Sequence, residues 1–181
     1  MVAVTTNGAA AAEGGMTPLA AAPAKMRPEA VSGPFPVPAE ALASPLSPAE
    51  AEALARRLND QEIVRHLRGH VQVTARGIVE VGLKEIMPFH LGGMESGAVN
   101  GAAIFAMLDC ALAGAGLVQF QGERCATMEM AVKIMRPVLP QGVRVIGYAI
   151  ARARNITFAR ADLFDVRGKV RVTATGIVTR I

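Results

Sequence analysis

Aromatic residues are scarce in this sequence. It has no tryptophan, a single tyrosine and an aromatic share of only 4%. Proteins that bind single-stranded nucleic acid usually combine basic residues with aromatic side chains on which the bases stack. The formal net charge of +4 would suit nucleic acid, but it suits a smaller anionic ligand such as a phosphorylated cofactor equally well. We therefore expect no nucleic-acid partner.

Cysteine is also rare, with only Cys110 and Cys125 in 181 residues. Two cysteines are too few for a disulfide scaffold, and Cys110 lies in an apolar run where it is expected to be a small buried side chain. Residues 1–15 lack the basic stretch and the continuous apolar stretch of a secretory signal. These observations predict a protein of the reducing cytoplasm.

One run, residues 98–118, is long and apolar enough to raise the question of a membrane span. Asp109 lies at its middle, much of it is alanine and glycine, and neither basic residues nor an aromatic belt bracket it. The composition favours a soluble protein with no membrane partner.

The chain divides into three parts. Residues 1–45 are rich in alanine, proline and glycine without a sustained apolar period, which predicts a flexible arm. Residues 46–69 are predicted to be helical, because Ser47, Pro48 and Glu50 form a capping-box pattern. Residues 70–181 are expected to form the folded domain, since 51% of the chain is hydrophobic.

The domain alternates strand and helix patterns in a simple order. Residues 70–86 predict a strand or a bulged strand pair, with Gly77 as the irregular point. A helix is predicted from about residue 100 to 118. Four further strands are expected at about 127–135, 143–152, 157–166 and 169–179. In the first of these, Met128 and Met130 are predicted to face the same way.

A long helix that is apolar nearly all round must be covered on most sides. A sheet of about five strands that curls around it would provide that cover. The sequence therefore predicts an α+β fold with a central helix and a curved antiparallel sheet.

Asp109 stands out, because its neighbours AAIFAMLDCALAGAG hold no other charge. Burial of a lone carboxylate costs several kcal/mol or raises its pKa. Two readings follow from this. Asp109 is either a bridging carboxylate at a dimer contact or a general base or nucleophile in an apolar cleft.

Longer motifs carry a resemblance to a known family. The run SGAVNGAAIFAMLDCALAGAG, then TMEMAVKIMRPVLPQG, and finally residues 168–181 follow one another in a recognisable order. Together they resemble the phenylacetyl-CoA thioesterase-like family of hot-dog proteins over about 110 residues. The resemblance implies the hot-dog fold, a homodimer or homotetramer, and hydrolysis of acyl-CoA or aroyl-CoA thioesters.

The resemblance also implies roles for individual residues. Asp109 occupies the position of the carboxylate that activates water or attacks the thioester carbonyl. Gly101 corresponds to the glycine whose N–H stabilises the developing oxyanion at the helix start, where free N–H groups and the positive helix dipole converge. Thr127 matches the strand hydroxyl that orients the water.

Three positions depart from the family pattern. Asn100 replaces a histidine, Met94 with Glu95 beside it replaces an asparagine, and Ala102 replaces a glycine. Asn100 could donate a hydrogen bond to the thioester oxygen or simply cap the helix. We expect Met94 and Glu95, together with His90 in the same loop, to lie near the substrate.

Coenzyme A needs cations for its phosphates. Arg152, Arg154 with Asn155 beside it, and Arg160 are the candidates, because guanidinium groups match phosphate oxygens. The alternative for each is a solvated positive surface. No cofactor is expected besides coenzyme A as part of the substrate, and no metal, since the pair His66 and His70 lacks a third ligand.

Helix geometry bears on assembly. Asn100 and Asp109 are nine residues apart, which places them on opposite faces of one helix. In the resembling family the site is shared between two subunits, and a dimer would solve this problem here. The alternative function, favoured by the missing histidine, is a non-catalytic acyl-CoA-binding or regulatory module.

Overall fold

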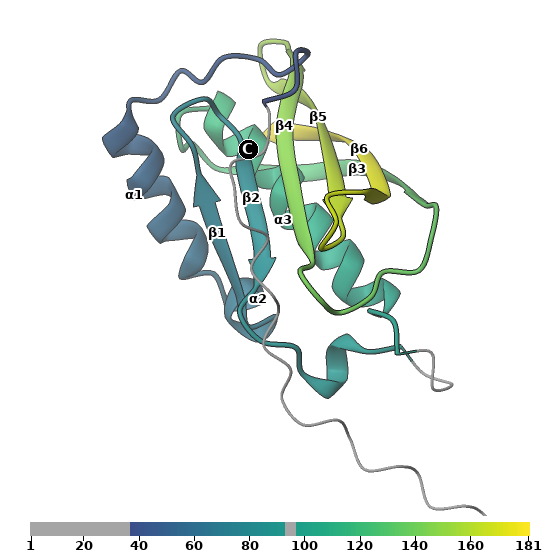
Figure 1. Ribbon diagram of the computed structural model, residues 1–181. Helices are drawn as coiled ribbons and strands as arrows, with labels where there is room; N and C mark the ends of the chain where they lie inside the picture. Colours follow the sequence, from purple (N-terminus) through teal and green to yellow (C-terminus); the bar gives the residue numbers. More distant parts are fainter. Residues whose placement is uncertain (1–36, 93–96) are drawn as a thin grey trace, which may run out of the picture.

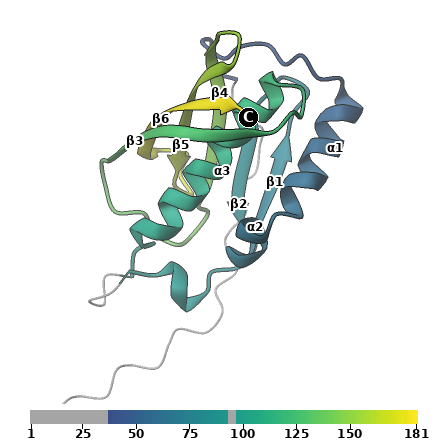
Figure 2. The ribbon, with the colours of Figure 1, turned by 180° about the vertical axis from the view of Figure 1, so that it is seen from behind.

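The computed structural model describes residues 37–92 and 97–181. A six-stranded antiparallel sheet of order β1-β2-β4-β5-β6-β3 curls around the long helix α3 (Figures 1 and 2). This is the predicted α+β architecture with a central helix. The elements are α1 Pro48–Asn59, α2 Glu62–His66, β1 Gly69–Val73, β2 Val79–Leu83, the 3-10 helix η1 Pro88–His90, α3 Gly101–Gln119, β3 Cys125–Ile134, β4 Arg144–Arg152, β5 Ile156–Phe164 and β6 Val170–Arg180.

Helix α3 is the core of the molecule. The side chains of Met107, Leu108 and Leu112 are fully buried, and α3 contacts five of the six strands. The helix is long and apolar enough to cross a membrane, but here the sheet encloses it. A Cβ atom on Gly147 of β4 would lie 2.4 Å from the carbonyl oxygen of Ala111. The helix backbone therefore rests directly on the strand, and only glycine allows that approach.

Strand β3 lies at one edge of the sheet and carries a bulge between Thr127 and Glu129. Met130 packs against the core, whereas the side chain of Met128 is 64% exposed. The prediction that Met128 and Met130 face the same way is therefore wrong. A bulge adds one residue to one strand and shifts the alternation of side chains beyond it.

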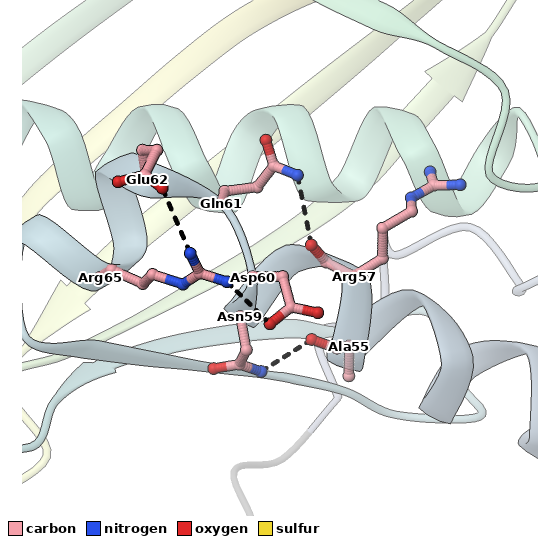
Figure 3. Close-up of polar contacts among 7 residues, drawn as sticks. All are labelled: Ala55, Arg57, Asn59, Asp60, Gln61, Glu62 and Arg65. Atoms are coloured by element: carbon pink, nitrogen blue, oxygen red, sulfur yellow. Dashed lines mark hydrogen bonds and ion pairs between the residues drawn. The ribbon is translucent and has the colours of Figure 1, made fainter.

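The two short helices are tied to the edge strand β1. The predicted capping box of α1 is present, with the Ser47 N–H donating to Glu50 Oε2 over 2.8 Å. At the other end of α1, Asn59 Nδ2 donates to the carbonyl oxygens of Ala55 (Figure 3) and Val71, both at 2.7 Å. The Val71 N–H donates back to Asn59 Oδ1. One amide side chain thus joins α1 to β1.

Residues 37–41 lie on the outer face of the sheet, the face turned away from α3. Val37 and Ala41 pack against Ile146 and Tyr148, and the Tyr148 hydroxyl donates to Glu40 over 3.0 Å. The sequence placed these residues in a flexible arm. The part of that arm that the structure describes belongs to the folded unit, and residues 1–36 lie outside the described residues.

Candidate active site

One arc of α3 is left uncovered by the sheet. Gly101, Ala102, Phe105 and Asp109 are exposed, whereas the second half of the helix has only buried or half-buried residues. At 100° per residue these four positions fall within about 100° of one another. Asp109 was expected to be buried on account of its apolar neighbours. In the single chain it is exposed, because those neighbours turn toward the sheet.

The uncovered arc begins at the N-terminus of α3. Asn100 Oδ1 accepts from the Ala103 N–H at 2.8 Å, and its Nδ2 donates to the carbonyl oxygens of Phe89 and Leu91. The side chain therefore caps the helix with both amide hydrogens engaged, which supports the capping interpretation over a contact with the thioester.

Gly101 is the first residue of α3. Its N–H and that of Ala102 meet no acceptor in the described part of the chain. Both residues are exposed. Free N–H groups at a helix N-terminus, where the dipole is positive, are suited to an anionic oxygen. The structure thus leaves Gly101 free for the role that the sequence suggested.

His90 ends the 3-10 helix η1, in the segment that leads to α3, and it is fully buried. Its Nδ1 accepts from the Met87 N–H at 2.9 Å, and its carbonyl oxygen accepts from the Asn100 N–H at 2.7 Å. Burial lowers the pKa of the imidazole, although the nearby Leu67 carbonyl opposes that shift. His90 therefore supports the loop that holds Asn100, and a role near the substrate stays a prediction. Met94 and Glu95 lie outside the described residues.

Two thiols lie near Asp109, Cys110 of α3 and Cys125 of β3, and Thr127 follows Cys125 two residues along β3. The Thr127 hydroxyl is buried and has no partner among the described residues, and it shares the inner face of β3 with Cys125, whose Sγ donates to the Ala113 carbonyl. Burial, with a contribution from the Asp109 carboxylate, raises the pKa of the Cys110 and Cys125 thiols to about 11. Such thiols stay protonated near neutral pH and are poor nucleophiles.

The predicted phosphate ligands separate into two groups. Arg152 lies over the Phe120 ring at 5.6 Å, and Arg154 is exposed in the β4–β5 turn. Asn155 Oδ1 accepts from Arg180. Arg160 instead lies on the outer face, where its Nε donates to Asp162 at 3.1 Å. That ion pair opposes a role for Arg160 in phosphate binding. The alternation of β5 also turns the Arg160 side chain to the face opposite Arg152.

The two histidines considered as a metal pair have separate surroundings. The His66 ring stacks on Phe89 at 5.3 Å, whereas the His70 ring lies against Gly82 of β2. The described residues contain no group of three or more potential metal ligands.

Solved structures provide the comparison that decides the fold. The E. coli PaaI protein from the phenylacetic acid degradation operon matches with a TM-score of 0.64 and 16% identity over 74% of this chain and 95% of that chain. A Shewanella oneidensis protein related to the thioesterase superfamily matches with a TM-score of 0.66 and 18% identity over 75% of this chain and 100% of that chain. This chain has the hot-dog fold.

A Haemophilus influenzae thioesterase shares the hot-dog fold with a TM-score of 0.58 and 20% identity over 72% of this chain and 90% of that chain. No protein-family model matches the sequence, and no curated protein matches it. The fold expected from the sequence motifs is confirmed by these structures, at identities too low to transfer individual residue roles.

One exposed side chain of the candidate site was not indicated by the sequence. Phe89 is 46% exposed beside the N-terminus of α3, and its backbone carbonyl holds Asn100. Proline at the first position of a short helix is a local signal, and it predicts the turn at Pro88–His90. Only the fold shows that this turn lies against Asn100.

Proposed function

We propose that this chain hydrolyses thioesters of coenzyme A with acyl or aroyl groups, and that it does so as a homodimer. The observation that carries the proposal is the uncovered arc of α3. On a hot-dog fold, it presents a carboxylate at Asp109 and the N–H groups of Gly101 and Ala102, which meet no acceptor among the described residues. These are the base and the oxyanion donors that thioester hydrolysis requires.

One helix cannot bring its own two groups together. Asp109 and Gly101 are eight residues apart, which is about 12 Å along the helix axis. Two copies solve this if Asp109 faces Gly101 of the partner subunit. In a two-fold dimer the reverse contact follows by symmetry, and the axis then passes near residue 105, midway between them. Phe105 is 42% exposed at that place, as expected for an apolar side chain that a second subunit covers in the dimer.

The reaction then proceeds through ordinary acid–base steps. Asp109 takes a proton from a water molecule that the Thr127 hydroxyl also holds, and the hydroxide forms a bond to the thioester carbonyl carbon. The N–H groups of Gly101 and Ala102 of the partner subunit bind the resulting oxyanion. When the tetrahedral intermediate collapses, the C–S bond breaks, the sulfur takes the proton, and a carboxylic acid and a thiol leave.

Coenzyme A would bind through its phosphates to Arg152 and Arg154, both exposed near the β4–β5 turn. The mechanism needs no metal and no cofactor beyond the coenzyme A of the substrate. We further propose a cytoplasmic location, in keeping with two cysteines that are both free.

The test is Asp109→Asn, with Glu129→Gln on β3 as a matched carboxylate-to-amide control. Hydrolysis of acetyl-, octanoyl- and phenylacetyl-CoA by Asp109→Asn should fall by roughly 10²-fold or more, while Glu129→Gln retains it. Because Asp109 is exposed, its replacement should change the free energy of unfolding by only about 0.5 kcal/mol. Undiminished hydrolysis by a folded Asp109→Asn protein would remove Asp109 from the mechanism.

The second candidate is an acyl-CoA-binding module without turnover. One observation favours it: both amide hydrogens of Asn100 are engaged by Phe89 and Leu91, so Asn100 adds no donor for the thioester. The same measurement separates the two functions, since a binding module would hold acyl-CoA without hydrolysing any chain length.

A further inference from the structure

Two segments that are separated in the sequence by β4 and β5 come together where β3 ends and β5 turns into β6 (Figure 1). Residues 133–137 run from the end of β3 into the loop that follows it, and residues 166–170 form the β5–β6 turn. Every residue of both segments is exposed. We call this surface, together with the exposed Leu139, the basic apolar surface.

Arg171 of β6 holds the two segments together. Its carbonyl oxygen accepts from the N–H groups of Met135 at 3.0 Å and of Arg136 at 3.3 Å. Its Nε donates to the carboxylate of Asp165 at 2.7 Å, and Asp165 Oδ1 accepts from two N–H groups of the β5–β6 turn, both at 2.9 Å. The shape of this surface is therefore fixed by backbone and buried polar contacts.

The positive charges of the basic apolar surface are not balanced. Asp165 does not neutralise them, because it is buried and its carboxylate is bound by Arg171. Four exposed cations have no side-chain partner among the described residues, namely Lys133, Arg136, Arg167 and Lys169. A cluster of cations without acids attracts an anionic partner.

Exposed aliphatic side chains lie between these cations. Met135 is 53% exposed and Leu139 is 56% exposed, and smaller parts of the same surface come from Ile134, Val166 and Val170. Neither segment contains an aromatic residue, so the bases of a nucleic acid would find no ring to stack on. Lysine and arginine interleaved with aliphatic side chains are typical of surfaces that bind anionic lipid.

Other occupants fit the basic apolar surface less well. Two copies of the chain that met here would bring the cations of both copies together, and such like charges repel. An acidic protein would match the charge, but protein contacts are usually anchored by aromatic side chains. Long cationic side chains, by contrast, can hold their charge at the headgroups while their apolar stems and the aliphatic side chains enter the acyl boundary.

We propose that the basic apolar surface binds an anionic lipid bilayer as a peripheral contact. Met135 and Leu139 enter the boundary between headgroups and acyl chains, and the four cations bind headgroup phosphates. The contact brings the start of α3 close to the lipid, because the carbonyl oxygen of Val138 accepts from the Val99 N–H at 2.7 Å. The inference goes beyond the proposed function and does not depend on turnover.

The sequence predicted no membrane partner, since residues 98–118 do not have the flanks of a membrane span. A peripheral contact needs no span. Each of the two segments carries only two cations, which is no conspicuous charge run. The surface arises only when β3 pairs with β6, with Ile134 opposite Val172.

Vesicle binding by the full-length chain tests the proposal. The chain should sediment with phosphatidylcholine vesicles that contain phosphatidylglycerol and not with vesicles of phosphatidylcholine alone, and added salt should release it. Arg167→Gln should weaken binding by roughly fivefold, the effect of one cation near an anionic bilayer. Met135→Ser should weaken it by roughly tenfold, because one apolar side chain no longer leaves water.

Two matched controls change the same kinds of side chain elsewhere. Arg124→Gln removes an exposed cation at the other end of β3, and Ile63→Ser removes an exposed aliphatic side chain on α2. Both variants should bind vesicles like the parent chain, and all four should keep its melting temperature.

Three results would overturn the proposal. The first is no binding to the anionic vesicles, or equal binding to the neutral ones. The second is a loss in Arg124→Gln and Ile63→Ser as large as in Arg167→Gln and Met135→Ser. The third is a change in oligomeric state of Met135→Ser without vesicles, which would make this surface an interface between copies of the chain. Hydrolysis enters none of these measurements, so the proposed function can fail without affecting this result.

Discussion

Asn100 connects two segments through one side chain. Its Oδ1 caps α3 at Ala103, and its Nδ2 holds the carbonyl oxygens of Phe89 and Leu91. The sequence indicated the cap, because asparagine is among the best N-cap residues. It could not indicate the second link, since Phe89 is 11 residues away in a turn whose position depends on the fold.

Two substitutions separate these contributions. Asn100→Ser keeps a capping oxygen and loses the contacts with the loop, whereas Asn100→Ala loses both. We expect Asn100→Ala to lower the free energy of unfolding by about 1–2 kcal/mol and Asn100→Ser by less, measured by urea denaturation. If the loop holds the N–H groups of Gly101 and Ala102 in place, both variants lose turnover. Full turnover in Asn100→Ser would show that the cap alone positions them.

His90 provides a prediction about pH. Burial holds its pKa below the ordinary value of 6.5 in the folded chain. Well above 6.5, at about pH 8, the imidazole is neutral in both states and adds no pH dependence. As the pH falls below that value, the unfolded chain takes up a proton that the folded chain does not, so the free energy of unfolding decreases until the lower folded pKa is reached.

The variant His90→Asn keeps an acceptor for the Met87 N–H and cannot titrate. Its free energy of unfolding should depend less on pH between about 8 and about 5 than that of the parent chain. At about pH 8 the difference between the two proteins measures lost packing alone. An unchanged slope would show that His90 titrates alike in both states. His70, whose pKa is also lowered, chiefly by burial, accounts for part of the slope that remains.

At the scale of elements, the contact between α3 and β4 depends on glycine. A Cβ atom at Gly147 would lie 2.4 Å from the carbonyl oxygen of Ala111, which is helix backbone and cannot rotate away. Gly147→Ala should therefore lower the free energy of unfolding by at least about 2 kcal/mol. Gly101→Ala, where a Cβ atom meets nothing within 4 Å, is the control and should leave thermal stability nearly unchanged. A normal melting temperature for Gly147→Ala would mean that α3 can shift on the sheet.

Most element boundaries could be predicted because local residues set them. The capping box at Ser47, the cap at Asn100 and the turn at Gly77, with its φ of 84°, act within a few residues. The bulge after Thr127 was missed, because it arises from pairing with β6. The contact of Glu40 with Tyr148 was missed for a related reason, since 108 residues separate them.

In the candidate site, too, features set by local residues could be predicted from the sequence, and features set by distant segments could not. The sequence indicates Asp109 as the lone charge of an apolar helix, and the family resemblance implies Gly101 at the helix start; both roles stay predictions. The exposure of Asp109 could not be predicted, because apolar neighbours imply a buried carboxylate unless the sheet is known to leave one arc of α3 uncovered. The ion pair of Arg160 with Asp162 could not be predicted either, because it depends on which face of the sheet these residues of β5 occupy.

At the scale of the whole molecule, the uncovered arc of α3 predicts assembly. If Asp109 faces Gly101 of the partner subunit, residue 105 lies at the two-fold axis. Phe105→Glu then places two carboxylates opposite each other in a contact that excludes water. We expect the parent chain to sediment as a dimer or tetramer at micromolar concentration, and Phe105→Glu to sediment as a folded monomer without thioesterase activity. The control is Phe158→Glu, an equivalent change at a side chain of nearly equal exposure, 41% against 42%, on the outer face of the sheet. It should retain the dimer. A Phe105→Glu monomer that still hydrolyses acyl-CoA would show that one chain contains a complete site.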